Sequence, residues 1–104
     1  MWQAAKDLVF GDTAIAELFG LDPDKVLKGL PLENYVEKVH PDDRTRLARN
    51  ISKAVGDGSP YNVDYRLRDD NGVVQLVTAM DKCFRSSDGK PADYAGIVYP
   101  VALR

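Results

Sequence analysis

The only histidine of the chain, His40, lies in residues 39–44 (VHPDDR), where an imidazole stands beside two carboxylates. Imidazole and carboxylate groups are the usual ligands of metals and the usual general acids and bases. The residues after His40 also read as the first turn of a helix, because proline is favoured there and acidic side chains favour the positive end of the helix dipole. His40 is therefore either a chemical group or a residue that packs or hydrogen-bonds at a helix start. We expect the structural role.

The adjacent carboxylates Asp42 and Asp43 are candidates for acid–base work or for a shared metal ion. Neighbouring residues on a helix point about 100° apart, so the two carboxylates cannot converge on one ion. Their expected role is to stabilise the start of the helix through its dipole. Arg44 is expected to pair with one of them or with a carboxylate in a loop.

The remaining reactive groups do not form a catalytic or metal-binding set. Cys83 is the only cysteine and is expected in a strand, as a small packed or surface residue. Residues 69–72 (DDNG) resemble the start of a calcium loop but lack its later glutamate, so a turn is expected. The sequence contains no Ser/His/Asp or Cys/His arrangement and no glycine-rich phosphate loop. We expect no catalytic residue and no metal site.

Size and composition indicate one soluble domain. The chain has 104 residues, of which 44% are hydrophobic and 29% charged, enough for a single core. The net charge of −2, with both signs scattered along the chain, argues against nucleic-acid binding and against a membrane-surface helix. No apolar run approaches the roughly 20 residues of a membrane span, and no signal peptide is recognisable. A single cysteine favours a reducing, cytoplasmic setting.

Helices are expected in the first half of the chain. Asp12 or Thr13 can cap a helix that Gly20 ends, and short helical turns follow over residues 21–29 and 31–39. The longest helix begins at Pro41 and ends at residues 56–58. Its single apolar stripe has the spacing of one helix face and consists of Leu47, Ile51, Ala54 and Val55.

Strands are expected before and after these helices. Residues 1–10 read as two small strands with a tight turn at Lys6-Asp7. Residues 61–68 alternate apolar and polar side chains, as in a half-buried strand, and a hairpin turn follows at residues 69–72. Residues 73–84 and 94–101 form two further strands, joined by a turn at residues 87–90. The order predicts an α+β domain with helices on one face of an antiparallel sheet.

These pieces, taken in order, resemble a PAS domain, in the branch found in bacterial sensor histidine kinases and cyclic-dinucleotide signalling proteins. The matching segments run along nearly the whole chain: residues 18–23 (LFGLDP), 39–44 (VHPDDR), 63–67 (VDYRL), 70–77 (DNGVVQLV), 87–90 (SDGK) and 96–98 (GIV). One departure lies at the end of the last strand. Family members close it with an Asp-Ile-Thr-like triplet, where this chain has Pro100, Val101 and Ala102. We expect Pro100 to sit at a sheet edge or to end the ladder, because it lacks an N–H donor. The usual coupling to a downstream domain then either takes another form or is lost.

The resemblance implies a five-stranded antiparallel sheet in the order 2-1-5-4-3, with helices packed across one face. It also implies a non-catalytic sensory or interaction module, residues 1–104 being part of a larger signalling protein with a kinase or cyclase output. Haem and flavin are not expected. Haem-binding relatives place their ligand within a helix that faces the pocket, and flavin-binding relatives carry an Asn-Cys-Arg-Phe motif that this chain lacks.

PAS domains often keep a small-molecule cavity between the long helix and the sheet. Tyr65 is the expected polar anchor of a ligand there, because a buried phenol seeks a partner. The alternative is a filled core without a ligand. The candidate pocket residues are Leu47, Ile51, Val55, Tyr65, Leu67, Val77, Ala79 and Ile97.

The strand of residues 73–84 carries apolar side chains on both faces, so its outer face is a candidate contact surface. The candidate interface residues are Leu76, Met80 and Val98. The expected partner is a second copy of the chain or a neighbouring domain or helix of the same protein. The two functions left open are a ligand-binding sensor and a ligand-free dimerisation module.

Overall fold

A computed structural model describes residues 1–4, 6–85, 87–89 and 91–101 of the chain. The elements are β1 (Trp2–Gln3), β2 (Leu8–Val9), α1 (Thr13–Phe19), α2 (Pro23–Lys28), α3 (Leu32–Val36), α4 (Pro41–Asp57), β3 (Tyr61–Arg68), β4 (Val74–Arg85) and β5 (Pro91–Pro100). The strands form one antiparallel sheet in the order β2-β1-β5-β4-β3. The predicted fold class and strand order are confirmed.

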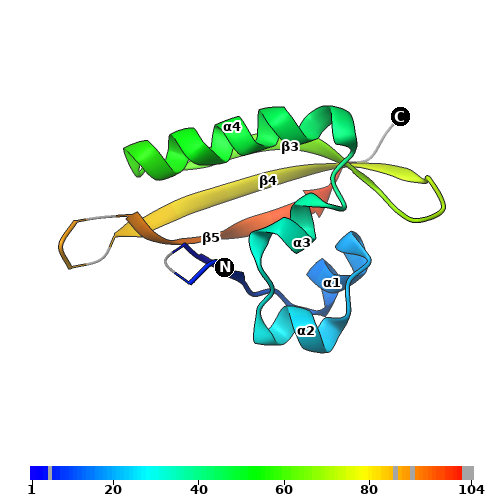
Figure 1. Ribbon diagram of the computed structural model, residues 1–104, viewed down its shortest axis with the longest axis horizontal. Helices are drawn as coiled ribbons and strands as arrows, with labels where there is room; N and C mark the ends of the chain where they lie inside the picture. The colour runs from blue at the N-terminus through cyan, green and yellow to red at the C-terminus, as the bar shows by residue number, and fades with distance from the viewer. Residues whose placement is uncertain (5, 86, 90, 102–104) are drawn as a thin grey trace.

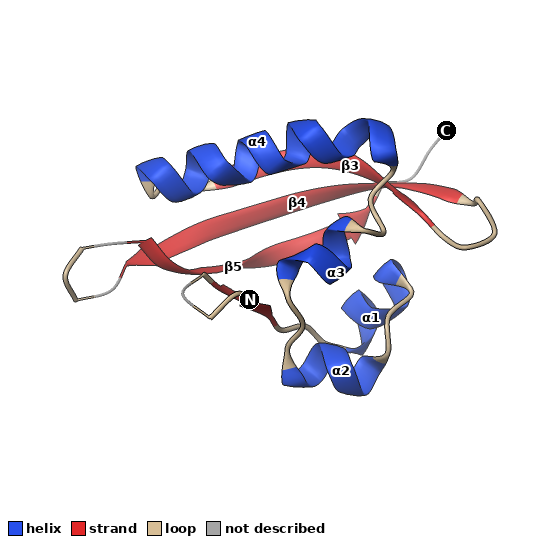
Figure 2. Cartoon of the chain, in the orientation of Figure 1, coloured by secondary structure: helices blue, strands red, loops and turns tan. Residues whose placement is uncertain are grey.

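The helices divide into two groups around this sheet. Figure 1 shows α4 running along β3 and β4, while α1, α2 and α3 lie together next to the N-terminal strands. The same arrangement, coloured by element type, is seen in Figure 2. The helix starts follow the predicted chemistry, since Asp12 caps α1 by accepting the N–H of Ile15 at 3.0 Å. Lys90 of the family-like segment 87–90, and Ala102 of the triplet that departs from the family, lie outside the described residues.

His40 has the structural role that the sequence predicts. It is the residue before α4, and its Nδ1 accepts the backbone N–H of Asp42 at 3.2 Å. Pro41 occupies the first helical position, where its missing N–H leaves no bond unmade. The side chain thus satisfies one of the free N–H groups of the helix start.

The segment around His40 also joins α4 to β3. The Asp43 carboxylate accepts three hydrogen bonds from Arg66: from the backbone N–H at 2.8 Å, from Nε at 3.0 Å and from a terminal guanidinium nitrogen at 2.9 Å. The backbone N–H of His40 donates to the Arg66 carbonyl at 2.8 Å, and that of Arg68 donates to the Lys38 carbonyl at 2.9 Å. We call this set, made by Lys38, His40, Asp43, Arg66 and Arg68, the helix–strand clamp.

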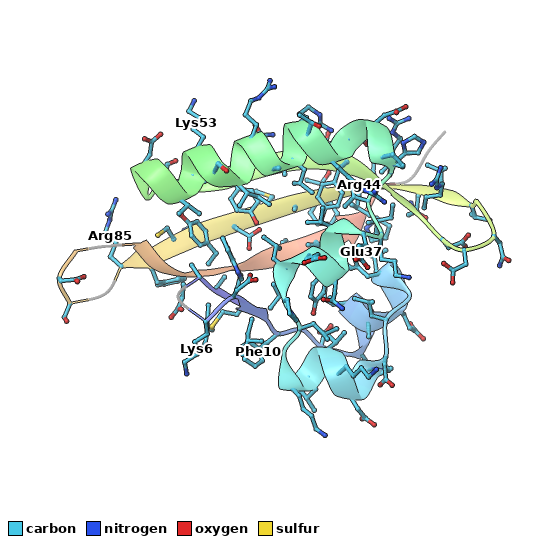
Figure 3. The ribbon with its side chains drawn as sticks, viewed as in Figure 1. Lys6, Phe10, Glu37, Arg44, Lys53 and Arg85 are labelled. Atoms are coloured by element: carbon cyan, nitrogen blue, oxygen red, sulfur yellow. The ribbon has the colours of Figure 1, made fainter. Side chains whose placement is uncertain are left out.

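The clamp contains the one acidic side chain of the described core. Asp43 is 8% exposed, and the hydrogen bonds of Arg66 lower its pKa to about 2 although burial opposes the shift. Arg44 does not pair with a carboxylate as expected. It donates instead to the carbonyls of Val39 at 3.0 Å and Glu37 at 2.8 Å (Figure 3).

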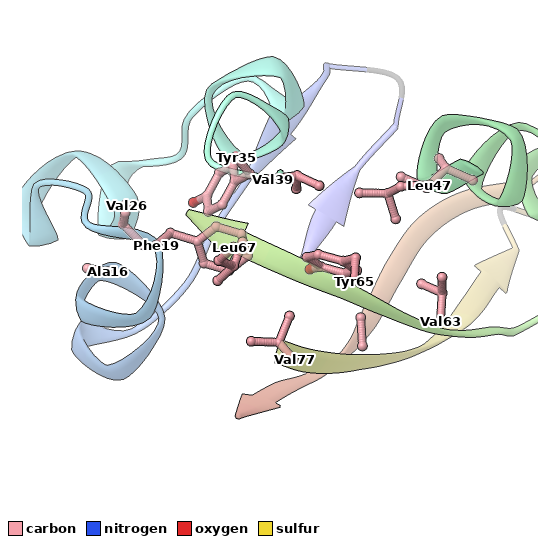
Figure 4. Packing of buried hydrophobic residues seen from close by; sticks show 12 residues of the cluster. Ala16, Phe19, Val26, Tyr35, Val39, Leu47, Val63, Tyr65, Leu67 and Val77 are labelled. Carbon is pink, nitrogen blue, oxygen red and sulfur yellow. The ribbon is translucent and has the colours of Figure 1, made fainter. Parts of the chain in front are cut away.

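The core lies between α4, α1–α3 and the inner face of the sheet (Figure 4). The predicted stripe of α4 faces inward, with Leu47, Ile51 and Ala54 buried. The buried apolar residues of β3 and β4 fall at every second position, as the period of a strand requires. They are Val63, Tyr65, Leu67, Val77 and Ala79. Thr78, between two of them, is buried as well, and its hydroxyl donates to Asp64 Oδ1 at 2.7 Å.

The prediction that Ile97 faces the pocket and Val98 the outer surface is wrong, because the two side chains lie on the opposite faces. Ile97 is 59% exposed on the outer face, while Val98 pairs with the buried Ala79 and packs against the core. The reason is an irregularity near the start of β5. Arg85 pairs with residue 91 and Phe84 with residue 93, so β5 has one extra residue. One extra residue changes the face of every later side chain in the strand.

Pro100 ends β5, as the sequence predicts. It lies opposite Val77, and the next residue donates its N–H to the Leu76 carbonyl at 2.9 Å. In an antiparallel strand, successive backbone N–H groups point to opposite sides, so the N–H of residue 101 faces β4 and the nitrogen of Pro100 points away from it. On that other side β1 pairs with residues 93 and 94, so it does not reach Pro100, and the missing N–H of Pro100 breaks no pairing with it.

We predict that Asp43→Asn lowers the free energy of unfolding by about 2 kcal/mol at neutral pH, because charged hydrogen bonds to Arg66 become neutral ones. Asp42→Asn is the matched control, since the side chain of Asp42 is 77% exposed, and it should change stability little. A lowered pKa stabilises the fold above pH 3.8, the ordinary value, and the contribution is lost as the pH falls towards 2. Urea unfolding between pH 2 and pH 7 checks both expectations. An equal effect of the two variants at pH 7 would contradict the assigned role.

Candidate functional site

A cavity of about 230 Å³ lies between the helices and the inner face of the sheet. Its helical walls come from α1, α3 and α4, including Ile15, Tyr35 and Ile51. Exposed residues such as Asp12 are also on its wall, so the cavity reaches the surface. Its size matters because a dry cavity of roughly 150 Å³ in another protein holds a benzene molecule.

The structure places half of the predicted pocket residues on the cavity wall. Those that line it are Leu47, Ile51, Tyr65 and Ala79. Val55, Leu67 and Val77 belong to the core beside it, Val55 being only half-buried. Ile97 faces away, and Val98, predicted for the outer face, lines the cavity instead. Contact of these residues with a ligand stays a prediction.

Sequence reasoning missed one of the two carboxylates of the cavity wall, Asp81. This residue lies on β4 two positions after Ala79, so both side chains are on the inner face. The signal was present in the sequence, because Asp81 continues the inward series that Val77 and Ala79 begin. A carboxylate at an inward position of a strand is costly unless it has partners.

Two neighbours surround the Asp81 carboxylate within the sheet. On β3 its cross-strand partner is Tyr61, and on β5 its partner is Gly96. A methyl group at Gly96 would overlap the carbonyl oxygen of Met80 and would lie 2.7 Å from Asp81 Oδ1. The missing side chain of Gly96 therefore provides the space in which the carboxylate sits. Both partners of Asp81 line the same cavity.

Burial shifts the pKa values of Asp81 and of the two tyrosines near it. It raises the pKa of Asp81 above its ordinary value, although the neighbouring Tyr61 phenol and then the positive charge of the Met1 ammonium oppose the shift. Burial, followed by the nearby charge of Asp81, also raises the pKa values of Tyr61 and Tyr65. Both phenols therefore stay protonated at neutral pH and can donate hydrogen bonds.

Aromatic rings form one side of this region. The Tyr94 ring lies 5.6 Å from that of Trp2 and 6.0 Å from that of Tyr61, measured between centroids. The Tyr94 hydroxyl donates to the Ala54 carbonyl at 2.9 Å, which ties β5 to α4. Burial, with a smaller effect of the opposite Cys83, raises the pKa of Tyr94 to about 12. Cys83 is half-buried in β4, as the sequence predicts.

The outer face of the sheet carries a second group of apolar side chains. Met80 and Ile97 are cross-strand partners and are 42% and 59% exposed, and Tyr99 beside them is 43% exposed. Leu76 lies on the same face and is half-buried. We call Leu76, Met80, Ile97 and Tyr99 the outer apolar patch. It contains two of the three predicted interface residues, Leu76 and Met80, whose part in an interface stays a prediction.

The described residues contain no cluster of histidine, cysteine and acidic side chains that could hold a metal ion. Within the same part of the chain, no helix combines the length and the apolar character that a membrane crossing requires.

Comparison with known proteins agrees with this architecture. The sequence matches the family model of the PAS fold over residues 8–98, so the chain belongs to the PAS fold family, a family of signal-transduction sensor modules. Comparison with curated proteins gives no match.

The chain is similar in fold to three solved structures. A diguanylate cyclase N-terminal domain with a PAS/PAC sensor, from Marinobacter aquaeolei, has a TM-score of 0.83 at 16% identity, covering 95% of this chain and 89% of that chain. A sensory box histidine kinase/response regulator from Burkholderia thailandensis E264 has a TM-score of 0.77 at 20% identity, covering 96% and 72%. A domain of a putative light and redox sensing histidine kinase from Haloarcula marismortui has a TM-score of 0.74 at 16% identity, covering 88% and 76%.

We predict that Gly96→Ala destabilises the fold by ~2 kcal/mol or more, because the added methyl group overlaps backbone and forces β4 and β5 apart. Gly56→Ala is the matched control. A methyl group at Gly56 meets no atom within 4 Å, and alanine is the better helix former by up to about 1 kcal/mol. Thermal unfolding of the two variants measures the difference. Equal stabilities would contradict the close approach at Gly96.

Proposed function

We propose that this PAS domain is a non-catalytic sensor that binds a small molecule in the cavity between α4 and the sheet. The cavity itself carries the proposal, since its apolar walls and few polar groups are the usual make-up of a small-molecule site. A ligand there would touch Leu47 and Ile51 of α4 and Ala79 of β4 at once. It would therefore change the packing between helix and sheet, as a shift between two populated states.

We further propose that the sheet passes this change to a kinase or cyclase output in the same cytoplasmic protein. Two observations support an output of this kind: the similar structures belong to histidine kinases and a diguanylate cyclase, and the outer apolar patch lies directly behind the cavity wall. Ala79 of the wall and Met80 of the patch are consecutive residues of β4. A movement of the strand at this point would alter both faces.

The contact made by the outer apolar patch is proposed to be with a second copy of the chain. The same face carries Lys82 and Asp93, which have opposite charges. In a two-fold symmetric contact of this face, Lys82 of one copy can therefore meet Asp93 of the other instead of a like charge. A symmetric dimer requires such a self-complementary surface. If the cavity takes no ligand, dimerisation through this patch is the function that remains.

We predict that Ala79→Leu abolishes binding of indole, a neutral probe of suitable size, because the larger side chain occupies part of the cavity and leaves too little room for the ring. NMR titration should show saturable shifts of the Leu47 and Ile51 methyl groups in the unmodified chain and none in the variant. Ala48→Leu adds the same atoms at an exposed position of α4 and should leave binding unchanged. Native mass spectrometry of the purified chain tests for a compound that co-purifies. Shifts that are absent from the unmodified chain, or unchanged by Ala79→Leu, would contradict a ligand cavity.

We predict that Ile97→Asp weakens self-association by about tenfold or more, because the carboxylate must give up its water in the interface. Leu27→Asp is the matched control, since Leu27 is 69% exposed on α2, away from the sheet. Sedimentation equilibrium at several concentrations measures both variants. A chain that is monomeric at high concentration, or a dimer that Ile97→Asp leaves intact, would rule out this face as the dimer contact.

A further inference from the structure

The charged side chains of the cavity wall are both acidic. Twenty residues line the cavity, and the only ionisable side chains among them, besides phenols, are the carboxylates of Asp12 and Asp81. The Met1 ammonium also belongs to the wall, where it donates to the Phe10 carbonyl at 2.6 Å. Asp12 is exposed and serves as the cap of α1. Asp81 lies on the inner face of the sheet with no lysine, arginine or histidine on the described wall to pair with it.

The surroundings of Asp81 leave its carboxylate with capacity to accept further hydrogen bonds. A carboxylate has about four acceptor positions, and the Tyr61 phenol is the neighbouring hydroxyl on β3 that lowers its pKa. Gly96 keeps the space on the β5 side open. The rings of Trp2, Tyr61 and Tyr65 line the same cavity, and aromatic rings stabilise a cation near their faces.

We propose that the cavity recognises a small amphipathic amine, whose ammonium group donates to Asp81 and whose apolar body lies against α4 and α1. This inference rests on the proposed function, the binding of a small molecule in this cavity. Phe19, Leu47, Ile51 and Val98 supply the apolar part of the wall. An ammonium group that leaves water needs both a countercharge and hydrogen-bond acceptors, and Asp81 provides them.

Ionised Asp81 lowers the stability of the ligand-free fold, which is not expected of a carboxylate whose role is structural. Burial raises the pKa of Asp81, so the ionised form is destabilised in the fold and stability is lost as the pH rises through that pKa. A neutral residue at position 81 should therefore leave the ligand-free chain as stable as before, or more stable, at neutral pH. Residues kept at the expense of stability are typical of functional sites.

The experiment compares three probes that share a phenyl body: 2-phenylethylammonium, neutral 2-phenylethanol and anionic 3-phenylpropanoate. Affinities are measured by NMR titration of the unmodified chain, of Asp81→Asn and Asp81→Ser, and of Asp24→Asn as an exposed control on α2. We expect the unmodified chain to prefer the ammonium probe over the alcohol by about tenfold or more, because a hydrogen bond between charged groups replaces a neutral one. The anion should bind most weakly.

Both neutral variants at position 81 should lose this preference, and Asp24→Asn should keep it. Two variants are used so that poor packing of one side chain does not decide the result, and circular dichroism verifies the fold of each. Equal binding of amine and alcohol by the unmodified chain would overturn the amine inference while leaving the ligand cavity in place. A preference that survives in Asp81→Asn and Asp81→Ser would overturn it as well. Failure of all three probes to bind at millimolar concentration would overturn it too, and the indole titration then decides separately whether the cavity binds small molecules.

Discussion

The buried carboxylate of Asp43 holds the two halves of this domain together. It belongs to the first turn of α4, yet its three hydrogen bonds all come from Arg66 of β3. The long helix is thereby fixed in direction and height over the sheet, and this placement brings Leu47 and Ile51 over the strands. This contact positions the α4 wall of the cavity together with the bond from the Tyr94 hydroxyl to the Ala54 carbonyl. Two of the family-like segments, residues 39–44 and 63–67, are thus the two sides of one interaction.

Much of the fold could be predicted because its signals are local. The start of α4 at Pro41, the turn at residues 69–72 and the alternation of β3 depend on neighbours in the sequence. Which residues face each other across two strands depends on how the strands pair, and local sequence patterns do not predict this pairing. The extra residue near the start of β5 reversed the faces of Ile97 and Val98 for this reason. The position of Asp43 at the helix start is predictable from its neighbours, but its bond to Arg66, 23 positions away, has no local signal.

In the candidate site, too, some residues are predictable from local sequence patterns and others depend on tertiary structure. Tyr65, Leu47 and Ile51 follow from helix and strand periodicity, whereas the N-terminal and α3 walls of the cavity follow only from tertiary structure. Asp81 is a different case, because its position on the inner face is deducible from Val77 and Ala79. A reading that looks only for apolar residues at inward positions passes over it. Polar residues that break such a series are informative because their burial must be compensated.

The clamp has a further consequence for how this sheet meets other molecules. β3 is the last strand on its side, and the open edge of such a strand is where another chain could add by main-chain pairing. Here the backbone groups of Arg66 and Arg68 already bond to Lys38, His40 and Asp43. On the opposite side, Val9 of β2 exchanges backbone hydrogen bonds with Leu30. Addition of a strand from another chain, and aggregation by repeated strand addition, are therefore disfavoured at both outer strands. A partner is left with the face of the sheet as its contact surface.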